Sequence, residues 1–236
     1  MQLFATWEQG LRASPTSRAV LLAALAAPEH SAEALGRFSV GQRDALLLQL
    51  RGQLFGPQFT CVAPCPACAE RVELDFDVEQ IAVRPPGDPC EVVELRHAEY
   101  RVLMRPPQVA DLLQIEGEPV VARRAALLAR CLSAEHAGQP LAAGALPDVL
   151  IGVIAAQLAA ADPQADVQLE LDCPACGHSW SAIFDIASFL WRELDAWARR
   201  MLREIHSLAL AYGWSEAAIL ALGPERRAAY LEMVRG

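Results

Sequence analysis

Cys65-Pro66-Ala67-Cys68 is a four-residue motif that occurs a second time in the chain, as Cys173-Pro174-Ala175-Cys176. Two cysteines separated by two residues can offer both thiolates to one metal ion, and two such pairs complete the four-sulfur tetrahedron that structural zinc prefers. Four sulfurs leave no open position for water or substrate, so the predicted role of the ion is structural. We therefore interpret the motifs as two halves of one zinc site, with the ligands Cys65, Cys68, Cys173 and Cys176.

Each motif stands between segments in which apolar and polar residues alternate. The apolar positions are Phe59, Cys61, Ala63 and Val72, Leu74, Phe76 around the first motif, and Val167, Leu169, Leu171 and Trp180, Ala182, Phe184 around the second. A period of two predicts a β-hairpin around each motif. When the two motifs are aligned, Phe76-Asp77-Val78 falls on Phe184-Asp185-Ile186, so the repeat extends beyond the cysteines. The sequence predicts two hairpins that face each other across one ion, as a split zinc-ribbon-like module.

Two other side chains near the motifs are alternative ligands. Cys61 shares a strand face with apolar residues, which favours a core position. His178 follows Cys176 by two residues and would strain a knuckle that is already formed. Cys90 and Cys131 are interpreted as incidental. A pair of redox dithiols is the remaining alternative, but such a dithiol uses a helix N-terminus to lower a thiol pKa, and these pairs lie between strands.

The residue after each motif differs between the two copies. Gly177 can adopt the positive φ that a metal knuckle often requires. Ala69 occupies the equivalent position after the first motif, where it is either strained or part of a different turn. The two halves are therefore not expected to be perfectly equivalent.

The remaining segments define the predicted domain organisation. Residues 1–57 are predicted to be helical, with Ser39 as an N-cap in a capping box with Gln42 and with Gly56-Pro57 ending that helix. The split zinc module spans 58–186. It contains an insertion at about 92–161, which comprises a hairpin turning near residues 97–99 and a helical segment over 108–161, preceded by a loop at 85–89. Residues 187–236 form a C-terminal helical region.

A long helix is predicted to follow the second hairpin. Its apolar positions recur at steps of three and four residues, and Gly213 ends the pattern. They are Ile186, Leu190, Leu194, Trp197, Met201, Ile205, Leu208 and Tyr212. The predicted fold class is therefore α+β, with two CxxC-bearing hairpins, surrounding amphipathic helices and a long C-terminal helix.

Composition limits the classes of function. The chain has 236 residues, 53% of them hydrophobic, and a formal net charge of −9, so it has a core but no general basic surface for nucleic acid. The first eight residues show no secretory signal, and the apolar stretch 149–161 is too short to span a membrane. No Gly-x-Ser-x-Gly, phosphate-binding glycine loop or HExxH is present. We predict a soluble, cytoplasmic, non-enzymatic protein.

Aromatic residues gather in the C-terminal region. Trp191 lies off the apolar stripe of the long helix, so it is expected to be exposed or to contact something other than the stripe's partners. One interpretation is that the helix packs wholly within its own fold. The other is a partner-binding surface, because tryptophan and tyrosine dominate protein interfaces. Its predicted residues are Trp191, Trp197, Tyr212 and Trp214.

Several segments together carry a resemblance to a known family. They are residues 43–48, Phe55-Gly56, the CPxC and CPxCGH hairpins, Phe189-Leu190-Trp191, the stretch 212–222, Arg226-Arg227 and Tyr230-Leu231. In these the chain resembles proteins of contractile-tailed phages and phage-like contractile injection systems, and is similar to the baseplate hub assembly chaperones of T-even-like phages.

The resemblance implies a non-enzymatic assembly or structural protein of a baseplate. It would bind hub, spike or tape-measure components in the bacterial cytoplasm, with incorporation into the assembled particle left open. A zinc-ribbon adaptor that binds nucleic acid or another protein complex is the alternative. Its densest basic candidates are Arg199, Arg200 and Arg203.

Overall fold

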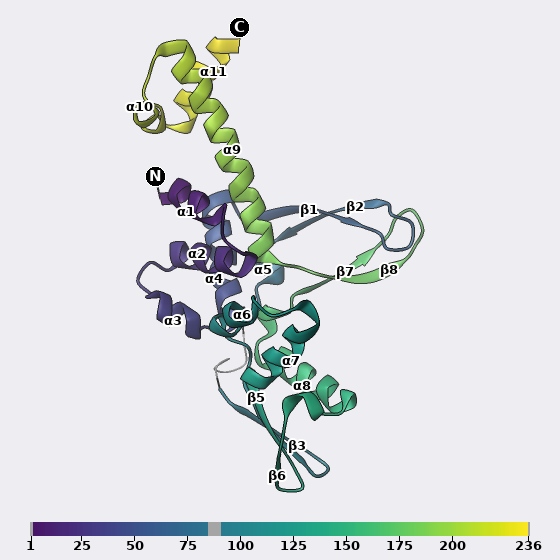
Figure 1. The fold of residues 1–236 in the computed structure, drawn as a ribbon. Helices are drawn as coiled ribbons and strands as arrows, with labels where there is room; N and C mark the ends of the chain where they lie inside the picture. Colours follow the sequence, from purple (N-terminus) through teal and green to yellow (C-terminus); the bar gives the residue numbers. More distant parts are fainter. Residues whose placement is uncertain (1, 85–90, 236) are drawn as a thin grey trace.

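Helices of the N-terminal part pack around the lower half of one long helix, α9 (Ile186–Tyr212), in a computed structural model that describes residues 2–84 and 91–235 (Figure 1). The N-terminal helices are α1 (Gln2–Gly10), α2 (Pro15–Ala26), α3 (Ala32–Arg37) and α4 (Val40–Phe55). The predicted capping box of α4 is confirmed: the Gln42 N–H donates to Ser39 Oγ at 3.0 Å, and the Ser39 N–H donates to Gln42 Oε1 at 2.9 Å. Gly56, with a φ of 88°, ends α4 as predicted.

Two antiparallel hairpins carry the CxxC motifs in their turns. They are β1 (Gln58–Pro64) with β2 (Arg71–Asp77), and β7 (Gln168–Asp172) with β8 (Ser179–Ile183). Both extend from the helical body in the same direction, so that their turns meet (Figure 1). An aspartate at or just after the end of each hairpin caps a helix: Asp77, the last residue of β2, caps the short α5 (Val78–Ile81), and Asp185 caps α9. The repeat recognised in the sequence therefore includes a helix start, and the α+β class is confirmed.

The insertion between the hairpins contains more β-structure than predicted. The hairpin of β3 (Val93–His97) and β4 (Tyr100–Met104) is confirmed, but it belongs to a sheet of order β3-β4-β5-β6 with β5 (Leu132–His136) and β6 (Gln139–Leu141). The prediction that residues 108–161 are helical is correct for α6 (Val109–Ile115), α7 (Val120–Cys131) and α8 (Asp148–Ala161), but wrong for 132–141. The predicted loop at 85–89 and Cys90 lie outside the described residues.

The physical reason for this error lies in a remote pairing and an unusual turn. Leu132 continues the apolar spacing of α7, yet it adopts an extended conformation because it pairs with Met104 of β4. The turn between β5 and β6 uses Ala137 and Gly138, both with positive φ, in the manner of a tight hairpin turn. The sequence did not indicate this turn, because alanine occupies its first position, where asparagine, aspartate or glycine is the usual signal.

The apolar residues form separate clusters. The main core lies between α2, α4, β1 and the first half of α9, and includes Leu22, Leu47, Phe59, Leu190 and Leu194. A second cluster packs α8 against the inserted sheet. A third lies at the far end of α9, beneath α10 (Glu216–Leu220) and α11 (Pro224–Arg235). Helix α9 thus joins the main core to the C-terminal cluster, while the inserted sheet lies at the opposite end of the molecule (Figure 1).

The end of the insertion is fixed against α4. The Gly41 N–H donates to Asp162 Oδ2 at 2.9 Å in a buried contact, and a Cβ at position 41 would collide with the Asp162 carboxylate. Gln164 contacts the segment at the end of α5, which follows the first hairpin: its Oε1 accepts from the Val83 N–H at 2.7 Å, and its Nε2 donates to the Ile81 carbonyl at 3.3 Å. These contacts set where the chain enters the second hairpin. Within the described parts of the chain, none of the helices has the length and apolarity needed to cross a membrane.

Candidate metal centre

The thiols of the two motifs lie together where the hairpin turns meet. Their sulfur atoms all lie within 4.8 Å of one another. The Sγ atoms of Cys65 and Cys176 are 3.7 Å apart, and those of Cys68 and Cys173 are 3.6 Å apart. Sulfurs placed about 2.3 Å from a tetrahedral zinc ion are separated by about 3.8 Å. The four cysteines predicted from the sequence are therefore close enough to hold one metal ion, with spacings that fit a tetrahedral site.

The two halves of the centre are related by an approximate twofold symmetry. Exchanging the two motifs converts the Cys65–Cys176 pair into the Cys173–Cys68 pair, and the two sulfur–sulfur distances, 3.7 and 3.6 Å, are nearly equal. The two copies of the repeat also meet at the base of the hairpins. There the equivalent residues Phe76 and Phe184 contact each other edge to face, with ring centroids 5.4 Å apart. The repeated sequence therefore meets its own copy at both ends of the hairpin pair.

The backbone around each motif forms the same knuckle. The Cys65 N–H donates to the Glu70 carbonyl at 2.8 Å, and the Cys173 N–H donates to the His178 carbonyl at 2.9 Å. Ala69 and Gly177 have φ values of 61° and 71°. Of the two alternatives for Ala69, the structure therefore shows the strained one. The inequivalence expected from the sequence is a difference in strain and not in shape.

Two opposite substitutions, one in each knuckle, test the positive φ at these positions. Ala69→Gly should raise the free energy of unfolding by up to about 1 kcal/mol, because left-handed backbone costs alanine about 1–2 kcal/mol and the flexibility of glycine in the unfolded chain offsets part of the gain. Gly177→Ala should lower it by about 1 kcal/mol through backbone strain alone, since a Cβ at this position has no atom within 4 Å.

Urea denaturation of the metal-loaded protein measures both effects, and metal content should stay the same in the two variants. A loss of stability in Ala69→Gly would contradict the shared knuckle geometry.

Burial and hydrogen bonding shift the pKa of the Cys65 thiol in opposite directions. Cys65 and Cys173 are each 2% exposed, whereas Cys68 and Cys176 are exposed. Burial raises the pKa of the Cys65 thiol, but the backbone N–H groups of Cys68 and Ala67 and the neighbouring thiols together lower that pKa to about 7. Donors aimed at sulfur favour the thiolate, which is the form that binds metal. The Cys68 thiol differs: the Glu70 backbone N–H lowers its pKa, but the neighbouring thiols and burial together raise that pKa to about 12, so the thiolate is favoured at Cys65 and not at Cys68.

The alternative ligands lie elsewhere. The group of potential ligands found among the described residues contains neither Cys61 nor His178. Cys61 is half-buried beside the main core. The His178 ring stacks with that of Trp180 at a centroid distance of 6.2 Å. The His178 backbone carbonyl accepts the hydrogen bond from the Cys173 N–H. Cys131 is buried, and its thiol lies 3.8 Å from Asp111 Oδ2.

The aromatic residues predicted as a partner surface occupy different environments. Of the two alternatives predicted for Trp191, the structure shows a contact and not exposure: the side chain is 9% exposed, its ring lies against Gly10 of α1, and the Arg18 guanidinium covers it at 4.7 Å. The side chain fits because Gly10 has no Cβ, a condition that the pattern of α9 alone does not reveal. Trp197 is half-buried, with its ring 5.0 Å from that of Phe4.

Tyr212 and Trp214 lie together at the far end of α9. Their rings stack at a centroid distance of 4.7 Å, and Tyr230 of α11 meets both edge-on, at 5.6 and 4.9 Å. Tyr230 is not among the residues predicted for this surface, although it lies in the same C-terminal region. Tyr212 is 37% exposed, so this cluster remains accessible.

A comparison with protein families gives one match. The family model described as T4 bacteriophage base plate protein matches residues 21–139, half of the chain. The matched segment begins in α2, includes the first CxxC hairpin and reaches the start of β6. No curated protein and no solved structure matches the chain. The second CxxC hairpin and α9 therefore lie beyond the matched segment.

Proposed function

The chain belongs to the T4 bacteriophage base plate protein family, and from this membership we propose that it is a non-enzymatic assembly protein of a contractile tail or injection-system baseplate. Its partners are hub, spike or tape-measure components, which it binds in the bacterial cytoplasm while the baseplate is built, as a hub assembly chaperone does. The observation that carries the proposal is the family match, which covers the second half of α2, helices α3 and α4, the first hairpin and most of the inserted sheet.

The proposed cofactor is one structural zinc ion held by Cys65, Cys68, Cys173 and Cys176. The sulfur spacing of 3.6–3.7 Å supports a tetrahedral ion. Four thiolates fill its coordination sphere and leave no position for a substrate, which supports a structural and not a catalytic role. When bound, the ion joins the hairpin inside the family-matched segment to the hairpin outside it. It thereby fixes the base of α9 relative to the rest of the protein and defines 58–186 as one module.

The proposed partner-binding surface is the accessible part of the C-terminal region. Tyr212 and Trp214, with Tyr230, form an aromatic cluster at the end of a helix of 27 residues that extends away from the metal centre (Figure 1). Half-buried Trp197 lies between this cluster and the main core. Rigid aromatic side chains supply a large contact area with little loss of conformational entropy, which supports a protein-binding role.

Co-expression tests the proposal. When the chain is produced together with the hub, spike and tape-measure proteins encoded beside it, it should co-purify with at least one of them at constant stoichiometry through size exclusion. Deletion of its gene should abolish assembled particles in electron micrographs. Assembly that proceeds normally without the gene, together with no complex in co-expression, would contradict the proposal.

The nucleic-acid adaptor gains no support from the arginine group on α9. Arg199 donates to Asp195 Oδ2 at 2.9 Å, so one of the three predicted basic residues is engaged within its own helix. The net charge of −9 further opposes binding to a phosphate backbone. A gel shift with single- and double-stranded nucleic acid at low salt should show no complex, and a salt-dependent complex would favour the adaptor instead.

A further inference from the structure

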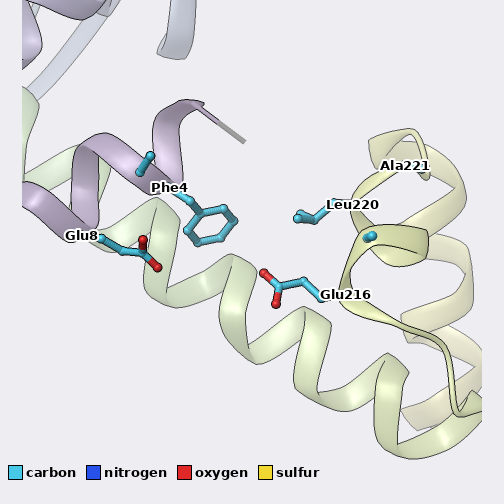
Figure 2. Close-up of a pocket in the computed structure, with 7 residues that line it drawn as sticks. Phe4, Glu8, Glu216, Leu220 and Ala221 are labelled. Carbon is cyan, nitrogen blue, oxygen red and sulfur yellow. The ribbon is translucent and has the colours of Figure 1, made fainter.

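A groove lies between α1 and α10, on the side of α9 (Figure 2). Its volume is about 710 Å³, within the range of about 300–1,000 Å³ typical of binding pockets. Helix α1 forms one wall and α10 the other, and α9 runs beneath both (Figure 2). The residues that line it are Phe4, Ala5, Glu8, Glu216, Ala217, Leu220 and Ala221. The groove therefore joins two helices that are far apart in the sequence.

The interior of the groove is apolar and fixed in place. The Phe4 ring is held by contacts with Trp197 and Trp7, at centroid distances of 5.0 and 6.4 Å. Leu220 faces it from the opposite wall (Figure 2). Alanines on both walls leave room between the two helices, because their side chains end at Cβ. An incoming apolar side chain would meet a preformed surface and bury area on both sides.

Two carboxylates give the groove its charge. Glu8 extends from α1 and Glu216 from α10, and their carboxylates point toward each other across the gap (Figure 2). Both residues are exposed, and neither has an ion-pair partner within residues 2–84 and 91–235. Two acids of α9 differ in this respect, because Asp195 pairs with Arg199 and Glu204 with Arg227. The groove thus combines an apolar interior with two unpaired negative charges.

We propose that this groove binds an amphipathic helix of a partner protein, whose apolar face packs between Phe4 and Leu220 and whose arginine or lysine side chains pair with Glu8 and Glu216. The inference rests on the proposed assembly function and specifies its docking surface. A helix fits because the walls are themselves helices, and an apolar stripe flanked by charges is how a helix docks into a hydrophobic groove. A basic partner relieves the repulsion between the two carboxylates.

A designed peptide tests the chemistry of the groove. The probe is a labelled helical peptide of about 18 residues, long enough to form a helix, with leucines at i, i+4, i+7 and i+11 and arginines beside them. Its affinity is measured by fluorescence anisotropy at low and at physiological salt. Glu8→Gln with Glu216→Gln should weaken binding about tenfold at low salt, and less at physiological salt, because exposed charges are screened.

A matched control separates the groove from the overall negative charge. Glu170→Gln with Glu232→Gln removes two exposed carboxylates elsewhere on the surface, so the net charge changes by the same amount. This control should bind the peptide as the native chain does. Equal weakening in both double variants, or equal binding of a peptide with glutamate in place of arginine, would overturn the proposal.

The apolar interior is tested independently of charge. Ala217→Leu should fill the groove and weaken peptide binding at least about fivefold, since the added side chain occupies the space of the incoming one. Ala229→Leu, at an exposed position of α11, is the control and should leave the affinity unchanged. Unchanged affinity in Ala217→Leu would place the binding site elsewhere and overturn the proposal.

Photo-crosslinking in the co-expressed complex separates this inference from the assembly function. With a diazirine analogue of leucine at position 220, which is close in size to the native side chain and so leaves the groove open, the cross-linked partner segment should be helical with an apolar stripe and flanking basic residues, whereas the same analogue at position 229 should give no cross-link to that segment. A complex that forms without any cross-link from position 220 would overturn the groove and leave the assembly function intact. Absence of any complex would overturn the assembly function, and the peptide measurements would still decide the groove.

Discussion

Replacing Cys173 with serine is expected to reduce bound zinc from one ion per chain to almost none and to separate the two hairpins. A structural zinc site contributes an apparent binding free energy of about 10–16 kcal/mol in small domains, and this energy is lost with a ligand. Because the helical cores remain, we expect only part of it to appear as lost stability. A loss of about 4 kcal/mol corresponds to a fall of about 10 °C in Tm for a chain of this size.

The measurement is the metal content of the purified variant together with its thermal unfolding. Cys65→Ser should behave in the same way, since the two residues are equivalent under the twofold symmetry of the site. Cys61→Ser serves as the control, because Cys61 is half-buried beside the main core and outside the cysteine cluster, and this variant should retain one ion. Stoichiometric zinc in either Cys65→Ser or Cys173→Ser would contradict a shared four-cysteine site.

Removal of the Arg51 side chain is expected to cost about 3 kcal/mol of stability, the lower end of the range observed when one partner of a buried ion pair is deleted, because the side chain of its partner Glu193 is 25% exposed. The Arg51 side chain is 4% exposed. It donates two hydrogen bonds to the Glu193 carboxylate, at 2.9 and 3.0 Å, and a third to the Gly56 carbonyl at 2.6 Å. Its guanidinium also covers the Phe59 ring at 3.9 Å. One side chain thus connects α4, the start of the first hairpin and α9.

Urea denaturation of Arg51→Ala measures this cost, with Arg199→Ala as the matched control. Arg199 pairs with Asp195 on the surface of α9, where its side chain is 58% exposed. Exposed pairs contribute about 0–1 kcal/mol, so the control should change stability very little. If the two variants lost similar stability, the buried pair would not be the connection between α4 and α9 that we describe.

The features that could be predicted from the sequence are those that depend on residues close together in the chain. The alternation on either side of each CxxC motif specifies the hairpins, Ser39 and Gln42 specify the start of α4, and Gly213 specifies the end of α9. The pairing of the two motifs was predictable as well, because a CxxC pair supplies only half of a tetrahedral site. The meeting of the four thiols follows from this shared requirement even though the whole insertion separates the motifs in the chain.

The features that could not be predicted depend on distant partners. Strand β5 exists because it pairs with β4, which precedes α6 and α7 in the chain, and its own sequence continues the pattern of the preceding helix. Trp191 is buried because Gly10, in a remote helix, leaves space for the ring. The groove between α1 and α10 has no local signal at all, since its two walls are far apart in the sequence. Tertiary packing determines each of these features.

The shared metal site is the central structural claim, and X-ray absorption at the zinc edge of the intact protein tests it most directly. Together with native mass spectrometry, it should show one zinc ion per chain, bound by four sulfur atoms at about 2.3 Å. Coordination by fewer than four sulfurs, or two ions per chain with each motif holding its own, would contradict the account of two hairpins joined through one site.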